Sequence, residues 1–160
     1  MNRRSAPYRP RALAQIARVP GLDYDVLDEL LGYSLRRAQV AMFIAFHEAT
    51  RGVHITPPRF TALVMIGANP GMSQTTLGNV LGIARSGAMA LTDWFEERGL
   101  VERRHRPDDG RAWGLYLTSR GERQVARMKR RVLAYDRRRA GTLSAAERRT
   151  LLRLLEKVAA

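Results

Sequence analysis

The chain has 160 residues and contains no cysteine, so neither a disulfide framework nor a thiol-based redox sensor is possible. It also lacks any apolar run that approaches the length of a membrane span. Its basic N-terminus is not followed by the uninterrupted apolar segment of a secretory signal. These absences predict a cytoplasmic protein that has no membrane partner.

Acidic residues are scarce: 15 aspartates and glutamates stand against 28 lysines and arginines, which gives a formal net charge of +13. Such an excess favours a polyanionic partner such as nucleic acid. The alternative is an arginine-rich composition whose charges are only solvated. A chain of this length has room for one domain with a hydrophobic core.

Residues arranged for catalysis are also missing. The sequence has no nucleophile elbow, no phosphate-binding glycine loop and no recognisable acid–base pair, so we predict no enzymatic activity and no cofactor. The residues that suggest a metal ion are His47, Glu48, His54 and His105. No cysteine and no close pair of ligands on one helical face support that reading, and we predict no metal site.

The most informative stretch covers residues 73–121. Apolar residues recur at helical spacing between residues 77 and 81, and Gly82 is suited to end that helix. A second amphipathic pattern occupies residues 84–98 and is followed by Gly99, a typical residue for a helix C-terminus. Two helices joined by a glycine turn are typical of a helix-turn-helix motif.

A basic hairpin is expected directly after the second helix. Residues 100–104 and 113–117 have strand-like patterns, and the segment HRPDDGRA between them carries proline, Asp-Asp and Asp-Gly turn chemistry. A hairpin in this place indicates the wing of a winged helix, which can set arginines on phosphates or in the minor groove.

Asp109 and Arg111, followed by Leu117, Thr118 and Gly121, lie in the segment RPDDGRAWGLYLTSRGE. This segment resembles the wing of the MarR family of winged-helix regulators. LTDWFEERGLVERR is similar to the family's junction between helix and wing, and the resemblance extends from residue 31 to the C-terminus. It implies a mainly α (α+β) fold: a winged helix-turn-helix domain whose N- and C-terminal flanking helices form a dimerisation domain.

The expected organisation has three parts. Residues 1–20 form a basic, proline-containing arm, which is either a flexible segment that contacts DNA phosphates or an inert tail. Residues 21–55 and 120–160 form the helical dimerisation region, and residues 56–119 form the winged helix-turn-helix domain.

The pattern of the first long helix starts in an acidic patch at residues 23–29. Between residues 39 and 49 it is apolar over much of its circumference, so burial against a second subunit is the economical cover. We further predict helix N-caps at four places: Thr56, Ser73, Ser119 with Glu122, and Ser144 with Glu147.

By position in the family's pattern, the resemblance implies contacts with double-stranded DNA from the helix-turn-helix and the wing. The expected DNA-binding residues are Ser73, Gln74, Thr75, Arg85, Ser86, Gly87, Met89, Ala90, Arg103, Arg104, His105, Asp109 and Arg111. Arg111, oriented by Asp109, would be the arginine that the wing inserts. Family members usually carry polar side chains where this chain has Gly87, Met89 and Ala90, so specificity depends either on methyl contacts with thymine or on DNA shape.

The segment GYSLRRAQ resembles MarR regulators that control the breakdown of plant-derived aromatic acids and respond to their coenzyme A thioesters. Paired arginines beside an apolar slot suit a ligand with an aromatic part and phosphates. The candidate effector-binding residues are Tyr33, Arg36, Arg37, Val40, Phe43, Ile44, Phe60 and Val64. The alternative is that the apolar residues are core and the arginines are charges on the dimer surface.

The function that follows is a homodimeric transcriptional repressor, released from a pseudo-palindromic operator by an aromatic acid or its coenzyme A thioester. The alternative is a non-enzymatic architectural or RNA-binding protein that acts by charge without a small-molecule effector. An enzyme of small aromatic substrates is the remaining class.

Overall fold

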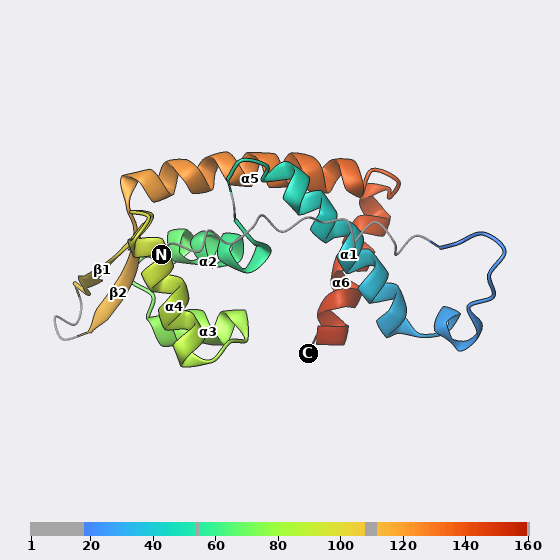
Figure 1. Ribbon diagram of the computed structural model, residues 1–160, viewed down its shortest axis with the longest axis horizontal. Helices are drawn as coiled ribbons and strands as arrows, with labels where there is room; N and C mark the ends of the chain where they lie inside the picture. The colour runs from blue at the N-terminus through green and yellow to red at the C-terminus, as the bar shows by residue number, and fades with distance from the viewer. Residues whose placement is uncertain (1–17, 54, 108–111, 160) are drawn as a thin grey trace, which may run out of the picture. The chain divides into compact units, whose positions relative to one another are not determined.

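The computed structural model describes residues 18–53, 55–107 and 112–159. Its elements are, in order, η2 (Asp25–Asp28), α1 (Leu31–Ala49), α2 (Pro57–Ala68), α3 (Gln74–Leu81), α4 (Arg85–Glu96), β1 (Val101–His105), β2 (Trp113–Leu117), α5 (Ser119–Arg139) and α6 (Ala145–Ala159) (Figure 1). The mainly helical fold with a small antiparallel sheet confirms the expected fold class. Among the described helices, none has the length and apolar character needed to cross a bilayer.

The chain divides into two compact units. The first is built from Met1–Ala49 and Ala134–Ala160, of which the structure describes 18–49 and 134–159, and the second from Thr50–Leu133. This division places the N-terminal part of α5 with the wing, whereas the sequence pattern assigned residues 120–160 to the dimerisation region.

The core of the second unit receives large side chains from four helices and from the wing. Each of these side chains is at most 2% exposed: Leu63 and Ile66 of α2, Leu77 of α3, Phe95 of α4, Leu115 of β2 and Met128 of α5. Full burial of such a side chain contributes about 1.5–3 kcal/mol. The unit is therefore held together by a core that every one of these elements shares.

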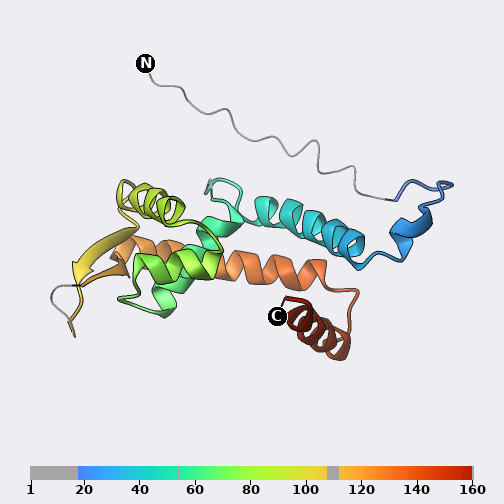
Figure 2. The ribbon, with the colours of Figure 1, turned by 90° about the horizontal axis from the view of Figure 1, so that it is seen from below.

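The wing is a two-stranded antiparallel ribbon that projects from the helices of its unit (Figure 2). Val101 lies opposite Leu117 and His105 opposite Trp113, so both expected strands are confirmed to within one residue. Met72 forms an isolated bridge with Leu115, with hydrogen bonds from Gly71 N–H to the Leu115 carbonyl at 2.9 Å and from Leu115 N–H to the Met72 carbonyl at 3.0 Å. This bridge ties the base of the ribbon to the segment that leads into α3.

Thr118 joins the wing to α5. Its hydroxyl donates to the Gly99 carbonyl at 2.7 Å and accepts the Gly121 N–H at 3.0 Å, which makes Thr118 the N-cap. The predicted cap at Ser119 with Glu122 is wrong by one residue, because Ser119 already lies in the helix. A Cβ on Gly121 would overlap the Leu100 carbonyl oxygen, so glycine permits the close approach of α5 to the wing. The Leu-Thr-x-x-Gly pattern thus has a structural cause.

The other predicted caps fall as follows. Thr56 is the N-cap residue of α2, but its side chain accepts no helix N–H, and prolines occupy the first positions of that helix. Ser144 and Glu147 form a reciprocal capping box: Ser144 N–H donates to the Glu147 carboxylate at 2.7 Å, and Glu147 N–H donates to Ser144 Oγ at 3.3 Å. Hydrogen bonds from the Ser144 side chain and from the Ser144 backbone N–H to the carboxylate lower the pKa of Glu147.

The first unit begins differently from its prediction. The acidic patch forms the separate 3-10 helix η2, and α1 starts only at Leu31. Asp23 Oδ1 accepts the Asp25 N–H at 2.9 Å, and Asp25 has a left-handed φ of 45°. The predicted helix start is wrong because this side-chain hydrogen bond competes with regular α-helical geometry.

Within the same unit, polar contacts join the helices at their ends. The Tyr135 hydroxyl of α5 donates to the Glu48 carboxylate of α1 at 3.0 Å, and Arg148 of α6 pairs with Asp136 at 2.7 Å. Burial and the hydrogen bond to Glu48 raise the pKa of Tyr135. Among the described residues of this unit, only Ala45 is buried.

Candidate nucleic-acid interface

Helices α3 and α4 and the turn between them form the predicted helix-turn-helix. Ser73 Oγ accepts the Thr76 N–H at 3.0 Å and caps α3, and Gly82 ends α3 with a left-handed φ of 62°. A Cβ on Gly78 would lie 3.3 Å from the Ala88 Cβ, so small residues bring the two helices close together. The motif read from the sequence is confirmed as a structural unit.

Helix α4 has two distinct faces. Ala88, Thr92 and Phe95 are buried. The Thr92 hydroxyl is satisfied within the helix, because it donates to the Ala88 carbonyl at 2.8 Å. The five residues predicted for the recognition face are all exposed: Arg85, Ser86, Gly87, Met89 and Ala90. This face is available to a partner, while the contacts assigned to its residues stay a prediction.

The three predicted residues at the start of α3 differ in their surroundings. Ser73 is half-buried, and its hydroxyl lies 2.8 Å from Thr76 Oγ1 in addition to its capping bond. Thr75 is exposed. The Gln74 side chain is half-buried, and its Nε2 is a buried donor with no hydrogen-bond partner in the structure. Such an atom normally costs free energy unless a partner arrives.

On the wing, two of the predicted residues stack on aromatic rings. The exposed Arg104 guanidinium lies 4.0 Å from the centroid of the Tyr116 ring, and its Nε lies 3.3 Å from the Glu102 carboxylate. The His105 ring stacks on Trp113 with 4.1 Å between centroids. Asp109 and Arg111 lie outside the described residues, so the inserted arginine stays a prediction.

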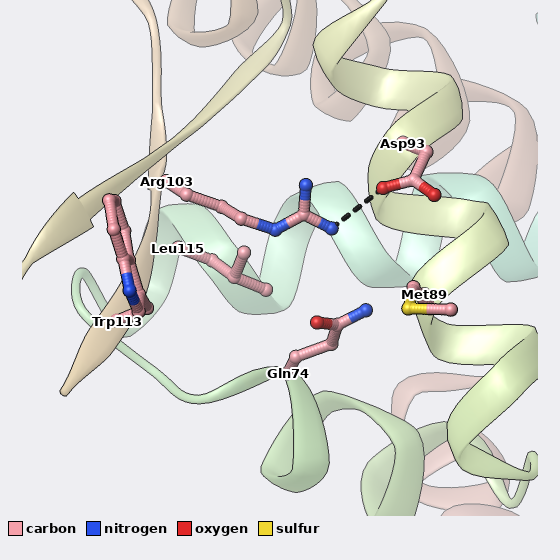
Figure 3. A pocket seen from close by; sticks show the side chains of 6 residues that line it. All are labelled: Gln74, Met89, Asp93, Arg103, Trp113 and Leu115. Atoms are coloured by element: carbon pink, nitrogen blue, oxygen red, sulfur yellow. Dashed lines mark hydrogen bonds and ion pairs between the residues drawn. The ribbon is translucent and has the colours of Figure 1, made fainter.

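Arg103 differs from its neighbours on the wing. Its backbone N–H donates to the Glu96 carboxylate at 3.1 Å, and its guanidinium pairs with Glu96. The guanidinium also pairs with Asp93 at 2.8 Å (Figure 3). The side chain is only 27% exposed. Both carboxylates belong to α4, so this predicted DNA-binding residue is already engaged within the protein.

A hollow of about 390 Å³ lies between α3, α4 and the wing. Its lining residues are Gln74, Met89, Asp93, Arg103, Trp113 and Leu115 (Figure 3). Asp93 and Trp113 were not singled out from the sequence, although Trp113 is 55% exposed. An aromatic residue at the first position of the second predicted strand, opposite a histidine, was the available signal.

The candidate effector residues are divided between the units. Six of them belong to α1 in the first unit: Tyr33, Arg36, Arg37, Val40, Phe43 and Ile44; Phe60 and Val64 belong to α2 in the second. The Arg37 guanidinium lies 5.8 Å from the centroid of the Tyr33 ring, one helical turn earlier, and Tyr24 lies 6.2 Å from Tyr33. An arginine of α1 thus stands beside the Tyr24–Tyr33 pair, and the binding role stays a prediction.

The histidines do not gather ligands in the described part of the chain. His47 Nδ1 lies 3.1 Å from the Phe43 carbonyl oxygen, and its ring packs 4.8 Å from Phe43. No group of three or more histidine, cysteine, aspartate or glutamate side chains that could hold a metal ion occurs among residues 18–53, 55–107 and 112–159. His54 lies outside the described residues.

A capped α3, an exposed α4 and a basic two-stranded wing define a winged helix-turn-helix transcriptional regulator. Residues 55–112 match the sequence profile of the MarR family. The chain is 36% identical over 129 residues to the transcriptional regulatory protein for the hcr operon of Thauera aromatica, a match that covers 80% of this chain and 78% of the relative. The chain belongs to the MarR family, and the resemblance carried by the wing motif is confirmed.

Solved structures of the family are also similar to this chain. The transcriptional repressor CouR bound to a 23-mer DNA duplex has a TM-score of 0.80 at 38% identity, with 87% of this chain and 99% of that chain covered. CouR bound to p-coumaroyl-CoA has a TM-score of 0.75 at 37% identity, covering 86% and 97%. The PcaV regulator of Streptomyces coelicolor, in complex with its natural ligand, has a TM-score of 0.73 at 28% identity, covering 86% and 96%.

Proposed function

We propose that the chain is a homodimeric, sequence-specific repressor that an aromatic acid or its coenzyme A thioester releases from a pseudo-palindromic operator. The observation that carries this proposal is the exposed face of α4 beside a basic wing, in a chain 38% identical to a repressor whose structure contains a DNA duplex. The net charge also supports DNA as the partner, because a charge of +13 favours binding to a polyanion.

A second copy of the chain is the partner that the first unit needs. Helix α6 buries none of its residues, and its apolar side chains are all more than one third exposed: Leu151, Leu152, Leu154, Leu155 and Val158. Apolar sets of this kind mark an interaction surface in soluble proteins. Pairing two copies about a two-fold axis would bury them and would present two recognition helices to successive major grooves, about 34 Å apart.

Contacts with DNA would divide between phosphates and bases. Arg104 is exposed and suits a phosphate, whereas Arg85, in the first turn of α4, would contact base edges. Each phosphate neutralised contributes about −0.9 to the slope of log affinity against log salt concentration. Operator binding should therefore weaken steeply as salt rises.

The effector would act by population shift. A ligand that favours a dimer whose recognition helices do not match the operator spacing weakens DNA binding in proportion to its differential affinity. Support comes from the Tyr33–Arg37 pair and the exposed Arg36 on α1, together with the CouR structure bound to p-coumaroyl-CoA. Phe60 and Val64 remain part of the proposed set.

The test is a gel shift of the DNA upstream of the chain's own gene, with a shuffled duplex of equal length beside it. We expect binding of the upstream fragment alone at moderate salt, and its release by p-coumaroyl-CoA. Free p-coumarate and free coenzyme A, added separately, show which part of the thioester the protein recognises when it releases the DNA. Equal binding of both duplexes would support the architectural alternative, and binding that no aromatic acid or thioester changes would remove the effector from the proposal.

The arginines of α1 provide a sharper test. Changing Arg36 and Arg37 together to Ala should leave operator affinity intact and weaken the response to p-coumaroyl-CoA by about tenfold or more, since charge-assisted bonds to phosphate contribute about 1.5–3 kcal/mol each. Arg51→Ala, in the exposed segment after α1, is the matched control. Loss of operator binding in the double variant would mean that these arginines hold the dimer instead.

A further inference from the structure

Arg103 occupies a place on the wing where a DNA contact was expected, yet its guanidinium faces the protein. We infer that Arg103 is a positioning residue: with Asp93 and Glu96 it fixes the orientation of the wing relative to α4. The inference rests on the proposed DNA-binding function for its biological meaning, but its geometry stands on the second unit alone.

The three residues form a clamp between α4 and β1. Asp93 and Glu96 are three residues apart, so both carboxylates leave the same side of the helix. Arg103, at the centre of β1, meets them with two guanidinium nitrogens and with its backbone N–H. Figure 3 shows the pair with Asp93. A planar guanidinium holds its donors in a rigid fork, so two bound carboxylates set its direction as well as its position.

The charge of the clamp argues against a direct role in binding DNA. One guanidinium stands against two carboxylates, which leaves no positive charge to attract a phosphate. Arg104 offers the contrast, because its side chain is 56% exposed and its Nε lies 3.3 Å from a single carboxylate, that of Glu102, among the pairs of the described residues. Of these two adjacent arginines, Arg104 is the one suited to contact DNA, and Arg103 is the one suited to hold β1 against α4.

The hollow explains why such a clamp is needed. It separates Trp113 and Leu115 of the ribbon from Met89 of α4, so close packing does not set the distance between ribbon and helix at this level (Figure 3). Arg103 and Asp93 both line the hollow, and their ion pair joins β1 to α4 there. At this level the directional ion pairs, instead of side-chain packing, fix the distance between the ribbon and α4.

The consequence concerns specificity more than affinity. Reading an operator requires α4 in the major groove and the wing on the neighbouring backbone or minor groove at the same time. Binding to random DNA depends on charge and tolerates a loosely held wing. Loss of the clamp should therefore reduce the preference for operator over random duplex.

The experiment compares Arg103→Met with its neighbour Arg104→Met in the full chain. Fluorescence anisotropy measures binding to the upstream fragment and to a shuffled duplex over a series of salt concentrations. For Arg103→Met we expect operator affinity to fall about tenfold, affinity for the shuffled duplex to change less than about twofold, and the salt slope to stay as in the wild type. For Arg104→Met we expect both affinities to fall and the slope to shrink by about 0.9.

Two results would overturn the inference. A slope that shrinks by about 0.9 in Arg103→Met would mean that Arg103 neutralises a phosphate itself. An unchanged preference for operator in that variant would mean that the clamp does not govern specificity. Should Arg103→Met fail to fold, Asp93→Asn removes one carboxylate from the exposed side of the clamp, and the same readings apply. A wild-type chain without any preference for operator would contradict the proposed function. That outcome can be distinguished from a failure of the clamp inference, because the clamp can be tested without DNA.

That DNA-free measurement uses the absence of cysteine. Single cysteines at the exposed positions Val80 and Glu102 can carry spin labels, and dilution with unlabelled chain removes distances between copies. We expect a narrow distribution of distances between α3 and β1 in the wild type and in Arg104→Met, and a broad or displaced one in Arg103→Met. Equal distributions in all three proteins would show that the clamp does not hold the wing.

Discussion

The two units of the chain are stabilised in different ways. In Thr50–Leu133, helices α2 to α5 and the wing each place a large side chain in a common core, with Phe95, Leu63 and Leu77 fully buried. In the first unit, Ala45 is the only buried residue among those described, and α6 buries none. The second unit therefore has the interior of an independent domain, while the first has helices whose apolar faces are still uncovered.

The difference agrees with the proposed division of the chain into a DNA-binding unit and a dimerisation region. A winged helix must hold its reading surface still, and a shared core does this. A dimerisation region has to keep its apolar surface for the partner, so it cannot bury that surface within one copy. The following changes test this contrast, beginning with the largest expected effect.

The largest effect is expected in the core of the second unit. Phe95→Ala should lower the free energy of unfolding by about 3–5 kcal/mol, because it removes a fully buried ring and leaves a cavity. Urea unfolding followed by circular dichroism measures the change. Leu154→Ala on α6 is the matched comparison, and its effect should depend on protein concentration because its proposed contact is with a second copy. A cost for Leu154→Ala that is equally large and independent of concentration would contradict the contrast.

The next effect concerns the uncovered face of α6. Leu151→Glu combined with Leu155→Glu should convert the dimer to a single chain and lower operator affinity by about a hundredfold, since one recognition helix then reads one half-site. Light scattering after size-exclusion chromatography measures the mass, and anisotropy measures the affinity. Thr150→Glu, on the same helix but outside the apolar set, serves as control and should stay dimeric. A double variant that remains dimeric would show that α6 is not in the interface.

The smallest effect is expected at the capping box of α6. Ser144→Ala removes the cap on the Glu147 N–H and the side-chain hydrogen bond that contributes most to the lowered pKa of Glu147, so that this pKa should rise toward its ordinary value near 4.5. A carboxyl whose pKa is lowered by folding stabilises the protein above its unfolded pKa, and this contribution disappears as the pH falls through the folded pKa. The difference in Tm between wild type and Ser144→Ala, about 2 °C at pH 7, should thus shrink below about pH 4.5. Titration by NMR and melting at both pH values check it, and a constant difference would exclude Glu147 as its source.

The local features of this protein followed from the sequence. Gly82, Ser73, the Ser144–Glu147 pair and both strands of the wing were placed correctly. Each depends on residues only a few positions apart, whose backbone preferences and hydrogen bonds act without the rest of the fold. The wing motif also sufficed to recognise the family.

Tertiary structure decided what depends on residues far apart. The cap at Thr118 is fixed by the Gly99 carbonyl, 19 residues earlier and on the other side of the wing in sequence. The orientation of Arg103 is fixed by two carboxylates, seven and ten residues earlier. A pattern of arginines on a strand cannot show which one finds an acid on a neighbouring helix, because ion pairing depends on distance in space and on burial. Sequence thus determined that the wing is basic, and only the folded chain decided that the Arg104 side chain is exposed while the Arg103 guanidinium lies against two carboxylates of α4.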